Sequence, residues 1–375
     1  MNVIELSHDS DAVTIIWKDE HRSEFDALWL FDNRPEHRDA RNGQRLVDVV
    51  DLPANPQIVR ARESGGALQL EWADGSASPI PLAWLREHCP CAAHGTETNR
   101  TRHWSASTPG VLDRFRYSEV SNDAAVRLSW LRAIDELGVA FLSGLPAEPG
   151  RVLDVAALIG WVRETNYGRV FDVRSVPSPH NLADTALALG LHTDNPYREP
   201  VPGLQVLHCL RAGATGGDSV FADGFSVVEA LRAEDRKAAN VLESTPVRFT
   251  WSNATCYLSA ERPIIEPGKG GPPTAVHYNS RSIAPLRLSA DRVREFYRAY
   301  RAFAGLLRDP RLLITTRLGE GDVVVFNNRR VLHGRTAFDP VCERHLQGCY
   351  LDRDGLMSCI AVASGRSGAS PFTGY

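Results

Sequence analysis

The amino-acid sequence predicts a mainly β protein with flanking helices, in which a double-stranded β-helix (jelly-roll) core follows a small β-rich N-terminal domain. Short strand-like apolar runs outnumber helix-like stretches along the chain. Residues with metal-ligand spacing fall near the ends of such runs, which suits a jelly roll. One tryptophan-containing pattern also occurs twice in the first hundred residues. We therefore expect two domains, at residues 1–98 and 110–365.

The repeated pattern predicts two copies of one small β unit. Trp17 and Trp29-Leu30 in the first copy match Trp72 and Trp84-Leu85 in the second, and in each copy the tryptophans stand twelve residues apart. An aspartate follows the first tryptophan by two positions in both copies. The residues that lead into these tryptophans, 13–17 and 67–72, alternate or run apolar as strands do. We expect the two copies to pack together with approximate symmetry.

The rest of the chain reads as a series of strands with three helices. Apolar residues at three- and four-residue spacing predict helices at Asp123–Leu137, Arg151–Arg163 and Ala290–Leu307. Strands are expected at Val139–Leu142, Leu204–Leu210, Ser219–Ala222, Val247–Trp251, Leu312–Leu318 and Asp322–Phe326.

Composition describes an ordinary globular protein. Charged residues make up 23% of the 375 positions and hydrophobic ones 43%, with a net charge of −4 that gives no basis for nucleic-acid binding. The chain has no apolar run of 18 residues and begins without a basic segment followed by an apolar one. Its seven cysteines are an odd number without disulfide-scaffold spacing. We expect a cytoplasmic protein without membrane or nucleic-acid partners.

A candidate metal site comes from His192-Thr193-Asp194 and the distant His333. Two imidazoles and one carboxylate on one face of a metal leave three coordination positions open, as in non-heme Fe(II) oxygenases. The HxD pair alone is a weak signal in a chain with 12 histidines. Arg344, eleven residues after His333, strengthens it because a guanidinium there can bind the far carboxylate of a 2-oxo acid.

Several ordered segments resemble a known family. GLHTDNPYREPVPGLQVLHCL (190–210), GGDSVFADGF (216–225), VVVFNNRRVLHGRTAFDP (323–340) and ERHLQGCY (343–350) resemble the γ-butyrobetaine hydroxylase-like branch of the Fe(II)/2-oxoglutarate dioxygenases, which share the core of taurine dioxygenase. The resemblance implies the jelly-roll fold, a γ-butyrobetaine hydroxylase-like N-terminal domain and a homodimer. It also implies Fe(II) on His192, Asp194 and His333, with 2-oxoglutarate on Arg344 and near Ser219.

The same resemblance implies hydroxylation of an unactivated C–H bond with O2 as co-substrate. Tyr167, Phe171 and Tyr350 match positions of an aromatic cage that binds trimethylammonium groups by cation–π attraction. A fourth cage position, often tyrosine, is Asp184, whose carboxylate pairs better with a primary ammonium. Desaturation, epoxidation and cyclisation remain open as outcomes.

The other end of the substrate is expected to be anionic. Asn181 matches a position that contacts the substrate carboxylate, and further donors are expected from Asn195, Arg198, Asn279, Ser280 and Arg281. Two arginines suit a phosphonate dianion, and HTDNPYR and HYNSRS resemble the branch that hydroxylates (2-trimethylaminoethyl)phosphonate. A phosphonate, including 2-amino- or 2-hydroxyethylphosphonate, is the first expectation and γ-butyrobetaine the alternative. A catalytically silent binding module and a zinc hydrolase are alternatives from other classes.

The N-terminal domain raises a second metal question. Family members commonly hold zinc with C-P-C-x-x-C after the first WL and a histidine in the second copy; this chain has Arg34, Glu36, Asp39 and Ser76 at those places. The second WL is instead followed by Cys89, Cys91 and His94 at the same spacing, and the first copy supplies His21. If the copies exchange roles, His21, Cys89, Cys91 and His94 form a Cys2His2 zinc site. The alternative is two free cysteines and two surface histidines.

Overall fold

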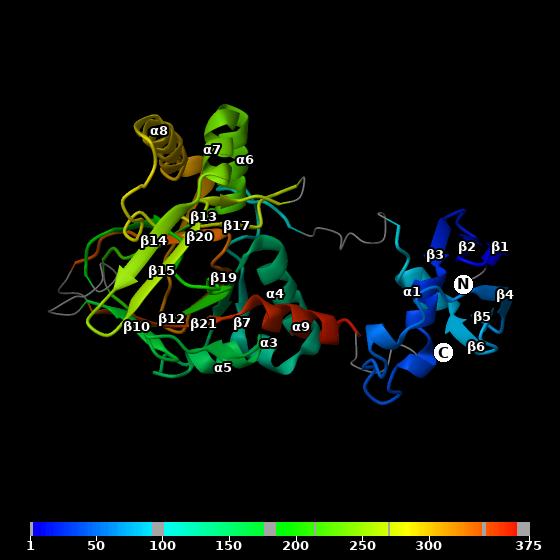
Figure 1. The fold of residues 1–375 in the computed structure, drawn as a ribbon. Coiled ribbons are helices and arrows are strands. Elements are labelled where there is room, and N and C mark those ends of the chain that lie inside the picture. The colour runs from blue at the N-terminus through cyan, green and yellow to red at the C-terminus, as the bar shows by residue number, and fades with distance from the viewer. Residues whose placement is uncertain are drawn as a thin grey trace. The chain divides into compact units, whose positions relative to one another are not determined.

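We describe the protein from a computed structural model, over residues 3–91, 101–175, 185–213, 215–268, 271–339 and 343–365. The chain divides into two compact units, one within residues 1–99 and the other within residues 100–365 (Figure 1). Each unit is described by itself. Within the described residues, no helix is long and apolar enough to cross a membrane.

The N-terminal unit consists of two copies of a three-stranded antiparallel sheet followed by a short helix. The first copy contains β1 (Val3–His8), β2 (Ala12–Trp17), β3 (Arg22–Asp26) and α1 (Ala27–Asp32); the second contains β4 (Ile58–Ser64), β5 (Ala67–Trp72), β6 (Ala77–Pro81) and α2 (Leu82–Glu87). Short 3-10 turns lie at Pro35–His37 and Val49–Asp51. Both copies thus have the same elements in the same order.

Alternating burial explains why the two copies need each other. In both β2 and β5 every second side chain is buried, which leaves one apolar face on each small sheet. These faces share a single core that includes Ile15 and Leu30 of the first copy and Leu70 and Leu85 of the second. A sheet must bury its apolar face against a second layer, and here each copy provides that layer for the other.

The second unit is built on two sheets. The seven-stranded sheet runs β10-β21-β12-β19-β8-β7, with β9 paired to β21; the four-stranded sheet runs β11-β20-β13-β18. Their bounds are β7 (Arg114–Arg116), β8 (Val139–Ser143), β9 (Val162–Arg163), β10 (Phe171–Arg174), β11 (Leu189–His192), β12 (Leu204–Ala212), β13 (Ser219–Asp223), β18 (Leu313–Thr316), β19 (Val323–Asn327), β20 (Val331–Arg335) and β21 (Arg344–Leu351). The sheets share a core that includes Leu207 and Phe326 of the larger sheet and Phe221 and Ile314 of the smaller one. This arrangement and the mainly β content confirm the predicted fold class.

Helices cover the outer faces of both sheets (Figure 1). On the larger sheet, α4 (Ala124–Leu137), α5 (Val152–Ala157) and α9 (Arg353–Ala363) pack against outward residues such as Val206 and Val325. On the smaller sheet, α6 (Gly224–Glu234), α7 (Arg236–Ser244) and α8 (Ala290–Leu306) cover Ala222 and Leu332. The remaining elements are α3 (Tyr117–Asn122), β14 (Val247–Ser252), β15 (Tyr257–Arg262), β16 (Ile265–Glu266), β17 (Ala275–Val276) and a 3-10 turn at Pro310–Leu312.

Two predicted elements differ from the structure. The helix expected at Arg151–Arg163 ends at Ala157, because Val162 and Arg163 pair with Leu351 and Tyr350 at the edge of β21. The strand expected at Leu312–Leu318 is shortened to Leu313–Thr316, since a 3-10 turn that begins at Pro310 takes its first residue. In the first place pairing with a distant strand outweighs the local apolar pattern, and in the second a local turn does so.

Candidate active site

Two paired strands bring the predicted metal-ligating residues together. His192 ends β11 and lies directly opposite His333, the central residue of β20, in the antiparallel ladder. Asp194 follows two residues after His192, with its Oδ1 3.2 Å from His192 Nε2 and its Oδ2 3.9 Å from His333 Nε2. The three donor atoms all lie within 4.8 Å of one another. The fold thus brings Asp194 and His333, which lie far apart in the sequence, into one cluster.

The charge states of this cluster fit a divalent metal. Burial, together with the neighbouring His192, lowers the pKa of His333 to about 3, so the imidazole is neutral near pH 7. Burial opposes ionisation of Asp194, but interactions with His192, His333 and Tyr350 outweigh it and hold the Asp194 pKa well below its usual value. His192 Nδ1 donates to the Gly190 carbonyl at 2.9 Å, which leaves its Nε2 lone pair facing the cluster. Two imidazoles and one carboxylate are the donor set of a non-heme Fe(II) site.

Asn328 holds the Asp194 backbone in place. Its Oδ1 accepts from Asp194 N at 2.7 Å, and its Nδ2 donates to Asp194 O at 2.9 Å and to Pro202 O at 3.2 Å. The side chain is fully buried. Sequence reasoning missed this residue, because an asparagine between two strands carries no signal of its own.

Replacing Asn328 with alanine should therefore loosen the cluster. Groups that orient metal ligands typically contribute about 10- to 100-fold to metal affinity or activity, and we expect a loss in that range for Asn328→Ala. The measurement is Fe(II) affinity under anaerobic conditions. Asn327→Ala is the matched control, because the Asn327 side chain accepts from Arg329 N at 3.0 Å instead. Equal Fe(II) affinity in the two variants would contradict the assigned role.

The cluster opens into a cavity of about 710 Å³ between the two sheets. Strand register explains its lining: on β13 and β20, Phe221 pairs with His333 and Ser219 with Arg335, so all four side chains share one face. These four residues line the cavity. The sequence analysis did not identify Arg335, although its position two residues after His333 places it on the same face of a strand. Its guanidinium donates to the carbonyls of Thr185 and Leu187.

Arg344 lies at the start of β21 and lines the same cavity. It is buried, and its Nε donates to the Gly217 carbonyl at 3.1 Å, which fixes the orientation of the guanidinium. Gly217 has a φ of 74°, and a Cβ at this position would lie 2.7 Å from Arg344 Cδ. The glycine pair that precedes Ser219 therefore makes room for the arginine. Arg344 and Ser219 offer the cavity a guanidinium and a hydroxyl.

Aromatic rings form one part of the cavity wall. The predicted Tyr167, Phe171 and Tyr350 line it, and the structure adds Tyr197 and Trp251. Trp251 lies 5.5 Å from the Tyr167 ring and 6.1 Å from the Tyr197 ring between centroids, and Phe171 lies 4.8 Å from Tyr350. The Tyr350 hydroxyl donates to Asp194 Oδ2 at 2.7 Å, so this ring joins the wall to the metal cluster.

Polar groups of the cavity come from Asn195, Asn279 and Arg281. The Asn195 Nδ2 is buried without a hydrogen-bond partner among the described residues, while its Oδ1 accepts from the Tyr197 hydroxyl at 2.6 Å. Burial lowers the pKa of the Arg281 guanidinium, and the charge of Asp194 opposes that change. Asn195 Nδ2 and Arg281 therefore offer donors to an anionic group.

The structure does not bring every predicted substrate residue to the cavity. Arg198 is not among its lining residues; the guanidinium lies 5.5 Å from the Tyr167 ring centroid and bonds to Asn166. Ser280 is exposed and does not line the cavity either. Asn181 and Asp184 lie outside the described residues.

Comparison with known proteins gives the family. The family described as "Taurine catabolism dioxygenase TauD, TfdA family" matches residues 98–350. The chain belongs to this TauD, TfdA family. A second family, "Gamma-butyrobetaine hydroxylase-like, N-terminal", matches residues 59–136 and confirms the γ-butyrobetaine hydroxylase-like branch. As a member of this branch, the chain is an Fe(II)/2-oxoglutarate-dependent dioxygenase.

Similar TauD-family relatives extend over nearly the whole chain. A gamma-butyrobetaine dioxygenase of Pseudomonas sp. (strain AK-1) is 40% identical over 361 residues, which is 94% of each protein. The gamma-butyrobetaine dioxygenase of Homo sapiens is 30% identical over 367 residues, or 93% of each. Among solved structures, an asparagine oxygenase complex with Fe(II) matches 63% of this chain and 80% of its own, with 21% identity and a TM-score of 0.49.

Proposed function

We propose that this protein hydroxylates a small zwitterion with a trimethylammonium group at one end and a carboxylate at the other, as in γ-butyrobetaine. The observation that carries the proposal is one cavity that holds an aromatic wall, anion donors and the His192, Asp194 and His333 cluster together. The 40% identity to a gamma-butyrobetaine dioxygenase over 94% of the chain supports the same substrate class.

In this proposal the metal cluster binds iron, and Arg344 binds the co-substrate 2-oxoglutarate. His192, Asp194 and His333 hold Fe(II), and the bound iron, with 2-oxoglutarate and O2, supplies the oxidant for an unactivated C–H bond. Arg344 binds the far carboxylate of 2-oxoglutarate through its guanidinium, and the Ser219 hydroxyl adds a hydrogen bond. The intact set of four residues disfavours a silent binding module, which would have no use for them.

The aromatic wall suits a quaternary ammonium. Such a cation has no N–H to donate, so it is recognised by the negative faces of aromatic rings. Tyr167, Tyr197 and Trp251 lie in mutual contact, and the hydroxyls of the two tyrosines are 2.9 Å apart. Arg198 and Asn166 support this group from outside the cavity lining. The rings are thus held rigidly, which lowers the entropy lost on binding.

Of the two arginines predicted for the anionic end of the substrate, only Arg281 lines the cavity. Arg281, Asn195 and Asn279 are the donors proposed for the carboxylate. The preference for a phosphonate depended in part on two arginines, and this part loses its support because Arg198 does not line the cavity. One guanidinium is sufficient for the two oxygens of a carboxylate.

Trp251→Ala tests the cation site. Loss of one ring should raise the KM for γ-butyrobetaine by about 2- to 30-fold, the equivalent of 0.5–2 kcal/mol of cation–π attraction. The wild-type protein should also prefer γ-butyrobetaine over 5,5-dimethylhexanoate, in which carbon replaces the charged nitrogen, and the variant should lose that preference. Trp161→Ala is the matched control, because Trp161 is 77% exposed and does not line the cavity. An unchanged KM and preference in Trp251→Ala would rule out this wall as the cation site.

A further inference from the structure

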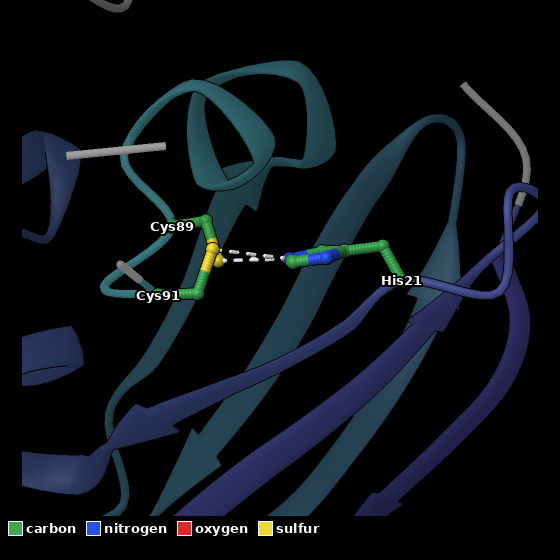
Figure 2. A group of neighbouring side chains, drawn as sticks. All are labelled: His21, Cys89 and Cys91. Carbon is green, nitrogen blue, oxygen red and sulfur yellow. Dashed lines mark hydrogen bonds between the residues drawn. The ribbon is translucent and has the colours of Figure 1, made fainter. Parts of the chain in front are cut away.

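A second cluster of metal-binding side chains lies in the N-terminal unit. His21 occupies the turn between β2 and β3, while Cys89 and Cys91 follow α2. His21 Nε2 lies 3.3 Å from Cys89 Sγ and 3.4 Å from Cys91 Sγ. Figure 2 shows both sulfurs facing the edge of the imidazole. The dioxygenase cavity involves none of these residues.

The spacing of the donors fits one tetrahedral zinc ion. Zinc binds sulfur at roughly 2.3 Å and histidine nitrogen at about 2.0–2.1 Å, so a tetrahedral angle separates the two donors by about 3.6 Å. The observed separations lie within a few tenths of an ångström of that value. Two thiolates and an imidazole select zinc over hard cations such as Mg²⁺ or Ca²⁺.

The duplicated fold supplies an internal comparison. Each position of the first copy matches the residue 55 positions later, so His21 corresponds to Ser76, and Arg34 and Glu36 correspond to Cys89 and Cys91. In the counterpart, Arg34 donates to Ser76 Oγ at 2.9 Å and lies 3.4 Å from Glu36. One copy therefore fills this place with an ion pair between side chains.

The hydroxyls beside the two places also correspond. Ser78 donates to Glu36 at 2.6 Å, and its equivalent Ser23 lies 3.0 Å from Cys89 Sγ. An ion pair between Arg34 and Glu36 occupies the equivalent place on a matching backbone. Thiols are therefore not required for packing at the place where Cys89 and Cys91 lie. The imidazole and thiols of the other copy are instead a set of metal donors.

We propose that His21, Cys89 and Cys91 bind a zinc ion that links the two copies of the N-terminal unit. His21 belongs to the first copy and the cysteines to the second, so the ion ties together residues that are 68 and 70 positions apart. The role of this zinc ion is structural. The site exists only in the folded unit, so zinc binding stabilises the folded state. His94, predicted as the fourth ligand, lies outside the described residues, and the proposal depends on the other three alone.

Metal analysis of the purified full-length protein tests the proposal. Roughly one zinc ion per chain is expected after expression without added metal, as for a structural site. Cys89→Ser/Cys91→Ser should lose that zinc. Glu36→Gln, in the counterpart, and His192→Ala, in the active site, should both retain it. Zinc content that is equal in the cysteine variant and the wild type, or lost in His192→Ala alone, would overturn the proposal.

A second measurement does not depend on the folding of a variant. In the wild-type protein, Cys91 should resist alkylation by iodoacetamide until a strong zinc chelator is added, and peptide mass spectrometry would locate the label. Cys256 is partly exposed in the other unit and should react equally with and without the chelator. Equal alkylation of Cys91 with and without the chelator, or alkylation that requires a reductant instead of the chelator, would show that no zinc protects Cys91.

Discussion

Asp194→Ala is expected to abolish substrate-coupled succinate formation. Asp194 is the single carboxylate of the three-residue cluster, and its two oxygens lie 3.2 Å from His192 Nε2 and 3.9 Å from His333 Nε2. Changes to groups that merely orient ligands cost about 10- to 100-fold, so loss of an anionic ligand should exceed that range. The variant also removes the acceptor of the Tyr350 hydroxyl. We therefore expect activity below detection together with a loss of Fe(II) affinity.

The control for this prediction is an aspartate outside the cavity. The Asp291 side chain is 86% exposed in the first turn of α8, and Asp291→Ala should keep wild-type Fe(II) binding and turnover. Succinate release and anaerobic Fe(II) titration separate the two variants. If Asp194→Ala bound Fe(II) as tightly as the wild type, the assignment of the cluster as the iron site would be refuted.

Arg330→Met is expected to destabilise the dioxygenase unit by about 3–5 kcal/mol, the usual effect of removing one partner of a buried ion pair. Arg330 Nε and Nη2 each lie 2.9 Å from an oxygen of Asp223, and both residues are almost fully buried. The guanidinium also donates to the carbonyls of Glu136 and Arg102. Removal of the arginine leaves the Asp223 charge buried and those acceptors without this donor.

The neighbouring arginine offers a matched control. Arg329 is 38% exposed and reaches Glu266 only at 3.5 Å, so Arg329→Met should change stability by no more than about 1 kcal/mol. Urea unfolding of the two variants and the wild type would give the comparison. Similar unfolding free energies for Arg329→Met and Arg330→Met would contradict this account of the buried pair. The pair also joins the end of β13 to the residue that precedes β20, the two strands that carry Ser219 and His333.

The sequence predicted those site residues that stand at a characteristic spacing from one another. His192, Asp194, His333 and Arg344 stand in short motifs on or next to strands, and the two sheets bring them to one cavity. Asn328 and Trp251 were missed, because each acts through a contact with a segment far away in the chain. The duplicated tryptophan pattern, like these motifs, is a local signal that can be read from the sequence alone.

Substrate residues were the weakest part of the prediction. Arg198 and Arg281 both flank recognisable segments, and sequence cannot tell which way a loop arginine points. The structure places Arg281 at the cavity and Arg198 against the Tyr167 ring, so only one of the two arginines predicted to bind the substrate lines the cavity. Because Arg198 does not line the cavity, one reason for a phosphonate is removed, and a carboxylate becomes the proposed anionic group of the substrate.

The most direct measurement of the proposed function is succinate release after O2 is added to the protein with Fe(II) and 2-oxoglutarate. γ-Butyrobetaine, (2-trimethylaminoethyl)phosphonate and 2-aminoethylphosphonate would be compared with a reaction that contains no substrate. We expect strong stimulation by γ-butyrobetaine, with formation of the hydroxylated product, and little by the two phosphonates. Stimulation by a phosphonate alone, or by none of the three, would contradict it.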